Sequence, residues 1–304
     1  MIRIALIGTA HVHVADYLAA IAKDPGTRLV AVHGGDVPGV RRVDDVRQAL
    51  RDADMALVTT ATAEHNEVLR HTALARMPVL VEKPLAGDLP ETVRLVPLLA
   101  SGGTTAMFLR CAPAFRRVRS LLAGGELGEL AVVHLRFTHP GLLDGVFTGP
   151  AAWMRPVGGF TDLAIHLFDL LLWLQPRARL ALRATSWQED AGGAALLDWG
   201  GVPATVHAAW TSRPGGIHLH IEGSRDSVTV DGGRLSTTGH TEAHDPPRAE
   251  AAFEAFVGAL RGHARWEPPS AADIVAVAAL IDEARQPAGL EKSSLQLTRG
   301  IGTR

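Results

Sequence analysis

Short apolar runs alternate with helical patterns through the N-terminal third of the chain, and this alternation constrains the fold more than any other feature. The runs are residues 2–7, 29–32, 55–58 and 79–81. Apart from Arg3, each is apolar at consecutive positions, as strands buried on both faces of a parallel sheet are. We therefore expect residues 1–109 to form a Rossmann-type, doubly wound parallel sheet.

The end of this first domain contains a helix and a last strand. Asp88, with Glu91 three residues later, has the pattern of a helix N-cap, and we expect that helix to run to about Gly102. A further strand is expected at residues 104–108.

The pattern changes after about residue 110. Several segments between residues 180 and 230 alternate polar and apolar residues or carry β-branched residues, as strands of an open, largely antiparallel sheet do. A very apolar helix at 160–174 precedes them, and two helices near 248–261 and 270–285 follow. Residues 110–304 are thus predicted to be an α+β domain for substrate binding and oligomerisation.

Composition excludes several classes of protein. The chain has 304 residues, enough for two cores, and its formal net charge of -2 provides no field that would hold a nucleic acid. Its single cysteine, Cys111, cannot form an internal disulfide, which favours a reducing, cytoplasmic compartment. The apolar stretch 163–174 carries His166 and Asp169, so we expect no membrane span.

The turn after the first strand reads Gly8-Thr9-Ala10-His11-Val12-His13. A dinucleotide-binding turn needs glycines so that the backbone can approach a pyrophosphate and the helix can pack on the strand. Here only the first glycine is present, and an ordinary turn without a ligand explains the hexapeptide equally well. The position after the first strand favours the cofactor, with Gly8, Thr9, Ala10 and His11 as candidate contacts.

The second strand is followed by a candidate for the adenosine ribose. Asp36 lies a few residues beyond the strand and could accept the ribose hydroxyls, whereas Arg41 and Arg42 could favour a 2′-phosphate or be solvated loop charges. The choice between NAD and NADP stays open.

The apolar helix 160–174 carries three ionisable residues on one face. Asp162, His166 and Asp169 are four and three residues apart, so they share a narrow arc of the helix. Burying such groups costs several kcal/mol unless they pair or line a polar cavity. The stripe indicates a site, although carboxylates that merely hold a core histidine would give the same pattern.

The triplet Glu82-Lys83-Pro84 directly follows the strand 79–81, so Lys83 lies at the edge where a Rossmann sheet presents residues to a cofactor. A lysine and an imidazole suit the oxidation of a secondary alcohol: His166 removes the hydroxyl proton, Asp162 holds its tautomer, and Lys83 hydrogen-bonds the same oxygen. The alternative is an ordinary surface lysine.

With these residues the chain resembles the Gfo/Idh/MocA family over nearly its whole length. The resemblance is carried by the glycine turn at Gly8, by Thr60 with His65, by Glu82-Lys83-Pro84, by the run 124–128 and by the motif 158–169. It implies that Lys83, Asp162 and His166 line a nicotinamide pocket. It further implies a dinucleotide bordered by Thr60, His65 and Glu82, and a sugar or polyol bound by Arg110, Trp153 and Arg155, with Asp169 of the motif as a further substrate candidate.

The resemblance implies an NAD(P)-dependent oxidoreductase that interconverts a secondary alcohol and a ketone on a sugar, cyclitol or related polyol. Two alternatives keep the fold: a non-catalytic sugar-sensing relative, and a lyase or glycoside hydrolase that uses the nicotinamide transiently. We also expect a homodimer or homotetramer, because helices cover only one face of an open sheet.

The remaining histidines are not expected to bind a metal. His218 and His220 alternate along one predicted strand, and His207 lies on a neighbouring one. Without a carboxylate or cysteine at ligand spacing, they are predicted to face solvent or pair across the sheet.

Overall fold

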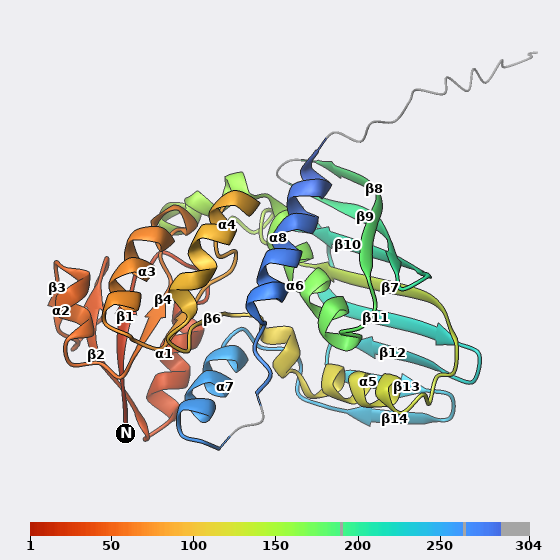
Figure 1. Cartoon of the computed structure of the whole chain (residues 1–304), viewed down its shortest axis with the longest axis horizontal. Helices are drawn as coiled ribbons and strands as arrows, with labels where there is room; N and C mark the ends of the chain where they lie inside the picture. The colour runs from red at the N-terminus through yellow and green to blue at the C-terminus, as the bar shows by residue number, and fades with distance from the viewer. Residues whose placement is uncertain (189–190, 264–265, 287–304) are drawn as a thin grey trace, which may run out of the picture.

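Two sheets lie side by side in the computed structural model, with helices around and between them (Figure 1). The structure describes residues 1–188, 191–263 and 266–286. Residues 287–304 of the predicted second domain lie outside the described residues. The predicted combination of a Rossmann-type parallel sheet with a largely antiparallel second sheet is confirmed.

The first sheet is parallel and has the order β3-β2-β1-β4-β5-β6. Its strands are β1 (Ile2–Ile7), β2 (Thr27–His33), β3 (Arg42–Val43), β4 (Met55–Val58), β5 (Val79–Val81) and β6 (Thr104–Thr105). The helices are α1 (Val14–Lys23), α2 (Val46–Leu50), α3 (His65–Leu74) and α4 (Leu89–Leu95). The strand order reverses between β1 and β4, and ligands of such sheets bind in the crevice beyond the carboxyl ends of the strands at that reversal.

Two expectations at the end of this domain are wrong in detail. The helix that begins at the Asp88 cap ends at Leu95 and continues as a 3₁₀ helix, η2 (Val96–Leu99). Pro97 has no N–H to continue the α-helical ladder, which explains the change. The strand expected at 104–108 is only two residues long, and a 3₁₀ helix, η3 (Phe108–Cys111), follows it.

The second sheet has the order β14-β13-β12-β11-β7-β10-β9-β8, and only the pair β7–β10 is parallel. Its strands are β7 (Leu130–Thr138), β8 (Leu180–Gln188), β9 (Gly192–Trp199), β10 (Val202–Ala209), β11 (Gly216–Gly223), β12 (Ser227–Asp231), β13 (Arg234–Thr237) and β14 (His240–Ala243). The short, polar β13 and β14 were not expected. His207 and His218 do not lie on adjacent strands as expected, because both pair with Arg136 of the intervening β7.

Helices cover one face of the second sheet. They are α5 (Pro113–Ala123), α6 (Gly159–Leu174) and α8 (Ala271–Arg285), with the 3₁₀ helix η4 (Gly149–Val157) leading into α6, whereas α7 (Ala251–Leu260) packs against η3. The predicted cap of α8 is confirmed as a capping box between Ser270 and Asp273. Within the described residues no single helix is long and apolar enough to span a membrane; η4 and α6 meet that criterion only as a pair bent by 70°.

The packed core is continuous between the two sheets. One cluster of buried apolar side chains includes Leu6 of β1, Phe168 of α6, Leu219 of β11 and Leu280 of α8. Helix α8 packs against both α4 and α6, and it runs between the two sheets in Figure 1. The predicted domain boundary between residues 109 and 110 does not coincide with a break in this core, and it stays a prediction.

A buried ion pair holds α6 to η3. The guanidinium of Arg110 donates to both carboxylate oxygens of Asp169, at 2.8 and 2.6 Å, and also to Asp273 of α8 at 3.2 Å. Arg110 and Asp169 are 3% and 1% exposed. Burial raises the pKa of Asp169 even though Arg110 opposes this. The pair thus ties three segments together around α6.

We expect Arg110→Met to lower the free energy of unfolding by about 3–5 kcal/mol, because it leaves a buried carboxylate without its partner. The double variant Arg110→Met/Asp169→Leu should recover most of this loss. Urea unfolding measures both, with Arg3→Met as a control, since Arg3 and Asp54 form an exposed pair. A single variant as stable as the double variant would contradict this account.

Candidate active site

The turn between β1 and α1 is shaped for close approach of a ligand to the backbone. Gly8 has φ +90°, and a Cβ there would lie 2.6 Å from the backbone nitrogen of Thr60, so a side chain would clash. The N–H groups of residues 9–12 donate no hydrogen bond within the described residues. Free amides at a helix N-terminus attract anions. The turn therefore fits a dinucleotide pyrophosphate despite its missing glycines.

The ribose candidate, Asp36, lies one residue after Gly35, which packs against Thr9 of the turn. Asp36 is exposed beyond the end of β2 and has no hydrogen-bond partner within the described residues. Thr9 packs against Gly35, and Arg41 is paired with Asp52 at 3.1 Å. An exposed carboxylate at this position can accept ribose hydroxyls.

Lys83 is buried, which excludes the alternative of a surface lysine. Its side chain is 3% exposed, and Nζ donates to the carboxylate Oδ1 and, at 3.2 Å, to the backbone oxygen of Asp162. The other carboxylate oxygen, Oδ2, accepts from the indole of Trp210 at 3.1 Å. The structure thus brings together a residue just after β5 and a residue of α6, which are far apart in sequence.

Asp162 does not hold the tautomer of His166, contrary to expectation. Both carboxylate oxygens of Asp162 are engaged by Lys83 and Trp210, and Nδ1 of His166 is buried without a hydrogen-bond partner among the described residues. The imidazole instead packs against Phe108 and Phe137, with ring centroids 4.6 and 6.0 Å away. Packing rather than a carboxylate orients this ring.

The charge state of His166 follows from its surroundings. Burial, and then the charge of Lys83, lower the pKa of His166 well below its ordinary value, although Asp162 opposes them. The imidazole is consequently neutral at physiological pH. A neutral imidazole beside a buried ammonium can accept a proton from a substrate hydroxyl.

Glu82 gathers three groups of the first domain around one carboxylate. Its Oε1 lies 2.9 Å from Nδ1 of His13, 2.5 Å from the hydroxyl of Tyr17 and 3.5 Å from Nδ1 of His11. Burial would raise the pKa of Glu82, but His11, His13 and Lys83 hold it well below its usual range. Burial lowers the pKa of His11 to about 4.

Three residues of this centre are not among the residues predicted from the sequence. They are His13 and Tyr17, which bind Glu82, and Trp210, which binds Asp162. A signal existed for Tyr17, because it is the sole tyrosine and lies four residues after His13, on the same face of α1.

The other residues predicted for the site differ in the contacts that they make. Trp153 of η4 donates its indole N–H to the carbonyl of Ala10 at 3.3 Å and thus reaches the turn. Thr60 is buried beside Gly8, and Nδ1 of His65 is 3.0 Å from the carbonyl oxygen of Leu85, just after Lys83-Pro84. Arg155 is exposed on η4. Arg110 and Asp169, predicted to bind substrate, are bound to each other.

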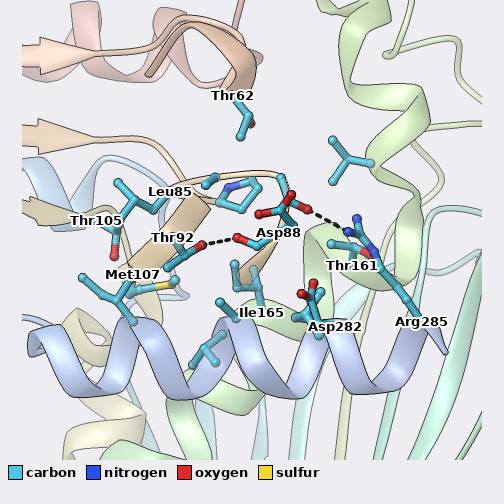
Figure 2. Close-up of a pocket in the computed structure, with 18 residues that line it drawn as sticks. Thr62, Leu85, Asp88, Thr92, Thr105, Met107, Thr161, Ile165, Asp282 and Arg285 are labelled. Atoms are coloured by element: carbon cyan, nitrogen blue, oxygen red, sulfur yellow. Dashed lines mark hydrogen bonds between the residues drawn. The ribbon is translucent and has the colours of Figure 1, made fainter. Parts of the chain in front are cut away.

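Three cavities lie near the centre. A groove of about 670 Å³ between η1 (Thr62–Glu64) and η4 is lined by Trp153 and Trp187. A second, of about 320 Å³, includes Phe108 and Phe137, the rings that contact His166. A third, of about 80 Å³, lies above α8 with Arg285 at one end (Figure 2). The first two provide open space close to the turn and to His166.

Several known dehydrogenases and a reductase are similar to this chain in sequence. The chain is 29% identical over 236 residues to a myo-inositol dehydrogenase of Streptomyces leeuwenhoekii, covering 71% of this chain and 69% of the relative. It is 27% identical to a dTDP-3,4-didehydro-2,6-dideoxy-alpha-D-glucose 3-reductase of Streptomyces violaceoruber, covering 96% of both. The match to an inositol 2-dehydrogenase of Pseudarthrobacter chlorophenolicus spans 46% of that protein's length.

Solved structures share the fold. An inositol dehydrogenase homologue from Azotobacter vinelandii, complexed with NAD+, has a TM-score of 0.77 at 19% identity, covering 93% of this chain and 95% of that one. A 3-ketoreductase from Actinomadura kijaniata, in complex with TDP-benzene and NADP, has a TM-score of 0.70 at 22% identity, covering 93% and 96%. At such identities the likeness concerns the fold alone.

Two family matches cover most of the chain and confirm the resemblance inferred from its motifs. Residues 2–109 match the family described as an oxidoreductase family with an NAD-binding Rossmann fold, and residues 115–229 match the GFO/IDH/MocA C-terminal domain. Since these ranges together span well over half of its length, the chain belongs to the Gfo/Idh/MocA family of oxidoreductases.

Proposed function

We propose that this protein is an NAD(P)-dependent oxidoreductase that interconverts a secondary alcohol and a ketone on a sugar, cyclitol or related polyol. The observation that carries the proposal is the buried pair of Lys83 and Asp162 next to the neutral imidazole of His166, close to a turn with free amides. The relatives named as an inositol dehydrogenase and a sugar 3-reductase support the same reaction class.

The described residues provide the parts of a dinucleotide site. The amides of residues 9–12 would hold the pyrophosphate, Asp36 the adenosine ribose, and Thr60 and Glu82 would border the rest of the cofactor. When bound, the nicotinamide supplies the acceptor or donor of a hydride. NAD and NADP remain the two candidates.

Each catalytic residue has a distinct task in this proposal. His166 takes the proton of the substrate hydroxyl, and Lys83 stabilises the negative charge that develops on the same oxygen. Asp162 orients Lys83 and compensates its charge, which makes it a partner of the lysine rather than of the histidine. Trp153 and Arg155 are the substrate candidates on η4, while Arg110 and Asp169 would reach a substrate only by giving up their mutual pairing.

We further propose a homodimer or homotetramer through the second sheet, and a cytoplasmic location. Helix α6 packs against β7, β9 and β10 on one face of this sheet, while His134, Arg136 and His207 are exposed on the other face. A second copy of the chain would cover that face. The location rests on the single cysteine.

Lys83→Ala should lower kcat/KM by about 10²–10⁴-fold, because it removes the group that hydrogen-bonds the reacting oxygen. The assay is stoichiometric NADH or NADPH formation with a polyol panel that includes myo-inositol, after fluorescence titration with both nucleotides. Lys23→Ala is the matched control, since Lys23 is exposed at the end of α1.

The same assay separates the alternatives. Turnover that needs only catalytic amounts of nicotinamide would indicate a lyase or hydrolase, and sugar binding without turnover would indicate a sensor. Failure of both nucleotides to bind at millimolar concentration would overturn the oxidoreductase assignment.

The pH dependence of alcohol oxidation should follow His166. Its pKa is lowered in the fold, so the active neutral form persists below the ordinary imidazole range and activity falls only as the pH drops through the lowered value. Removing the ammonium removes one cause of that lowering. The acid limb of the residual activity of Lys83→Ala, or the imidazole NMR titration of His166 in that variant, should therefore move to higher pH. An unchanged limb would show that the two groups are not coupled.

A further inference from the structure

We propose that His11, His13 and Glu82 form a binding site for a divalent transition-metal ion of the zinc class. One candidate ligand atom from each residue lies within 4.8 Å of the others, and within the described residues this is the one such group of three. The ion would bind the side chains of His11, His13 and Glu82, whereas the dinucleotide would bind the backbone amides of residues 9–12. The proposal therefore does not depend on the proposed reaction.

The distances suit a small ion. Zinc binds imidazole nitrogen and carboxylate oxygen at about 2.0–2.2 Å in tetrahedral sites, which places neighbouring ligand atoms about 3.4 Å apart. Oε1 of Glu82 lies 2.9 Å from Nδ1 of His13 and 3.5 Å from Nδ1 of His11. Small side-chain rotations would therefore be enough to surround an ion.

The nitrogen of His11 that faces Glu82 carries its lone pair. This Nδ1 accepts the backbone N–H of His13 at 3.2 Å, so the ring proton is on Nε2. Nε2 is itself buried without a partner among the described residues. An unpaired buried donor costs about 1–3 kcal/mol. A metal bond to Nδ1 would replace this long hydrogen bond and would use the lone pair that already faces Glu82.

Surrounding groups hold the ligands in place. The hydroxyl of Tyr17 donates to Oε1 of Glu82, and the backbone N–H of Lys83 donates to Oε2 at 3.1 Å. The rings of His11 and His13 pack edge to face at 4.7 Å, and Trp153 packs against His11. Such supporting contacts orient the ligands in metal sites and strengthen binding.

Charge and ligand chemistry select the class of ion. Counting the imidazoles as neutral, the carboxylates of Glu82 and Asp162 face the single ammonium of Lys83, so the region carries one negative charge before an ion binds. Two imidazole nitrogens and one carboxylate oxygen suit zinc and its neighbours, whereas magnesium and calcium prefer oxygen ligands.

The test uses the untagged full-length protein, stripped with EDTA and titrated with Co²⁺ while visible absorption is followed. We expect one equivalent to bind with the intense bands of a low-coordinate site, Zn²⁺ to displace it and Mg²⁺ not to do so. His13→Asn should weaken Co²⁺ binding by at least about 100-fold, more than the effect of losing a supporting residue. His220→Asn is the matched control, because His220 also pairs with a glutamate, Glu222, but lies on the second sheet.

Thermal unfolding separates loss of the site from loss of the fold. Zn²⁺ should raise the Tm of wild type and of His220→Asn but not that of His13→Asn, since only an ion bound to the folded state stabilises it. Glu82→Gln gives a second variant if His13→Asn does not fold in EDTA. Absence of the cobalt bands in wild type, or bands that persist in His13→Asn and Glu82→Gln, would overturn the proposal. Turnover enters neither readout, so failure here leaves the proposed reaction untouched.

Discussion

The ion pair between Lys83 and Asp162 is the interaction on which the organisation of the centre depends. Both side chains are almost fully buried, and neither charge could be accommodated there alone, because an uncompensated buried charge costs several kcal/mol. The lysine lies just after β5 of the first sheet, and the aspartate lies in the first turn of α6 in the second half. The two halves of the molecule therefore meet at an ion pair to which each half contributes one charged side chain.

The apolar helix α6 shows how a buried element tolerates ionisable residues. Asp169 is satisfied by Arg110, and Asp162 by Lys83 and Trp210. His166 is different, because its Nδ1 has no partner within the described residues and its ring is held by phenylalanines. Of the three residues, the histidine is the one with a buried ring nitrogen that no other described residue binds.

Much of the fold could be predicted because it rests on local patterns. The strands β1, β4 and β5 are apolar at consecutive positions apart from Arg3, and the caps at Asp88 and Ser270 follow short-range rules. β13 and β14 were missed because they are short and mostly polar, and the strand after Thr104 was overextended because the following apolar residues turn into η3 to pack in the core.

The site could be predicted only as a list of residues. Motif spacing identified Lys83, Asp162 and His166, but which atoms bond to which depends on packing between the two sheets. The sequence could not show that Trp210 of the second half completes the surroundings of Asp162, or that Tyr17 turns toward Glu82. Both contacts join residues more than forty positions apart, for which no local rule exists.

The contact between Trp153 and the carbonyl of Ala10 has a thermodynamic consequence. A segment of the second half rests on the very turn whose amides are available to a ligand. A molecule on those amides that moves the indole would be coupled to η4, and by reciprocity the position of the indole would then change the affinity of that molecule by the same factor. Occupancy of the first half and the conformation of η4 would in that case be linked variables.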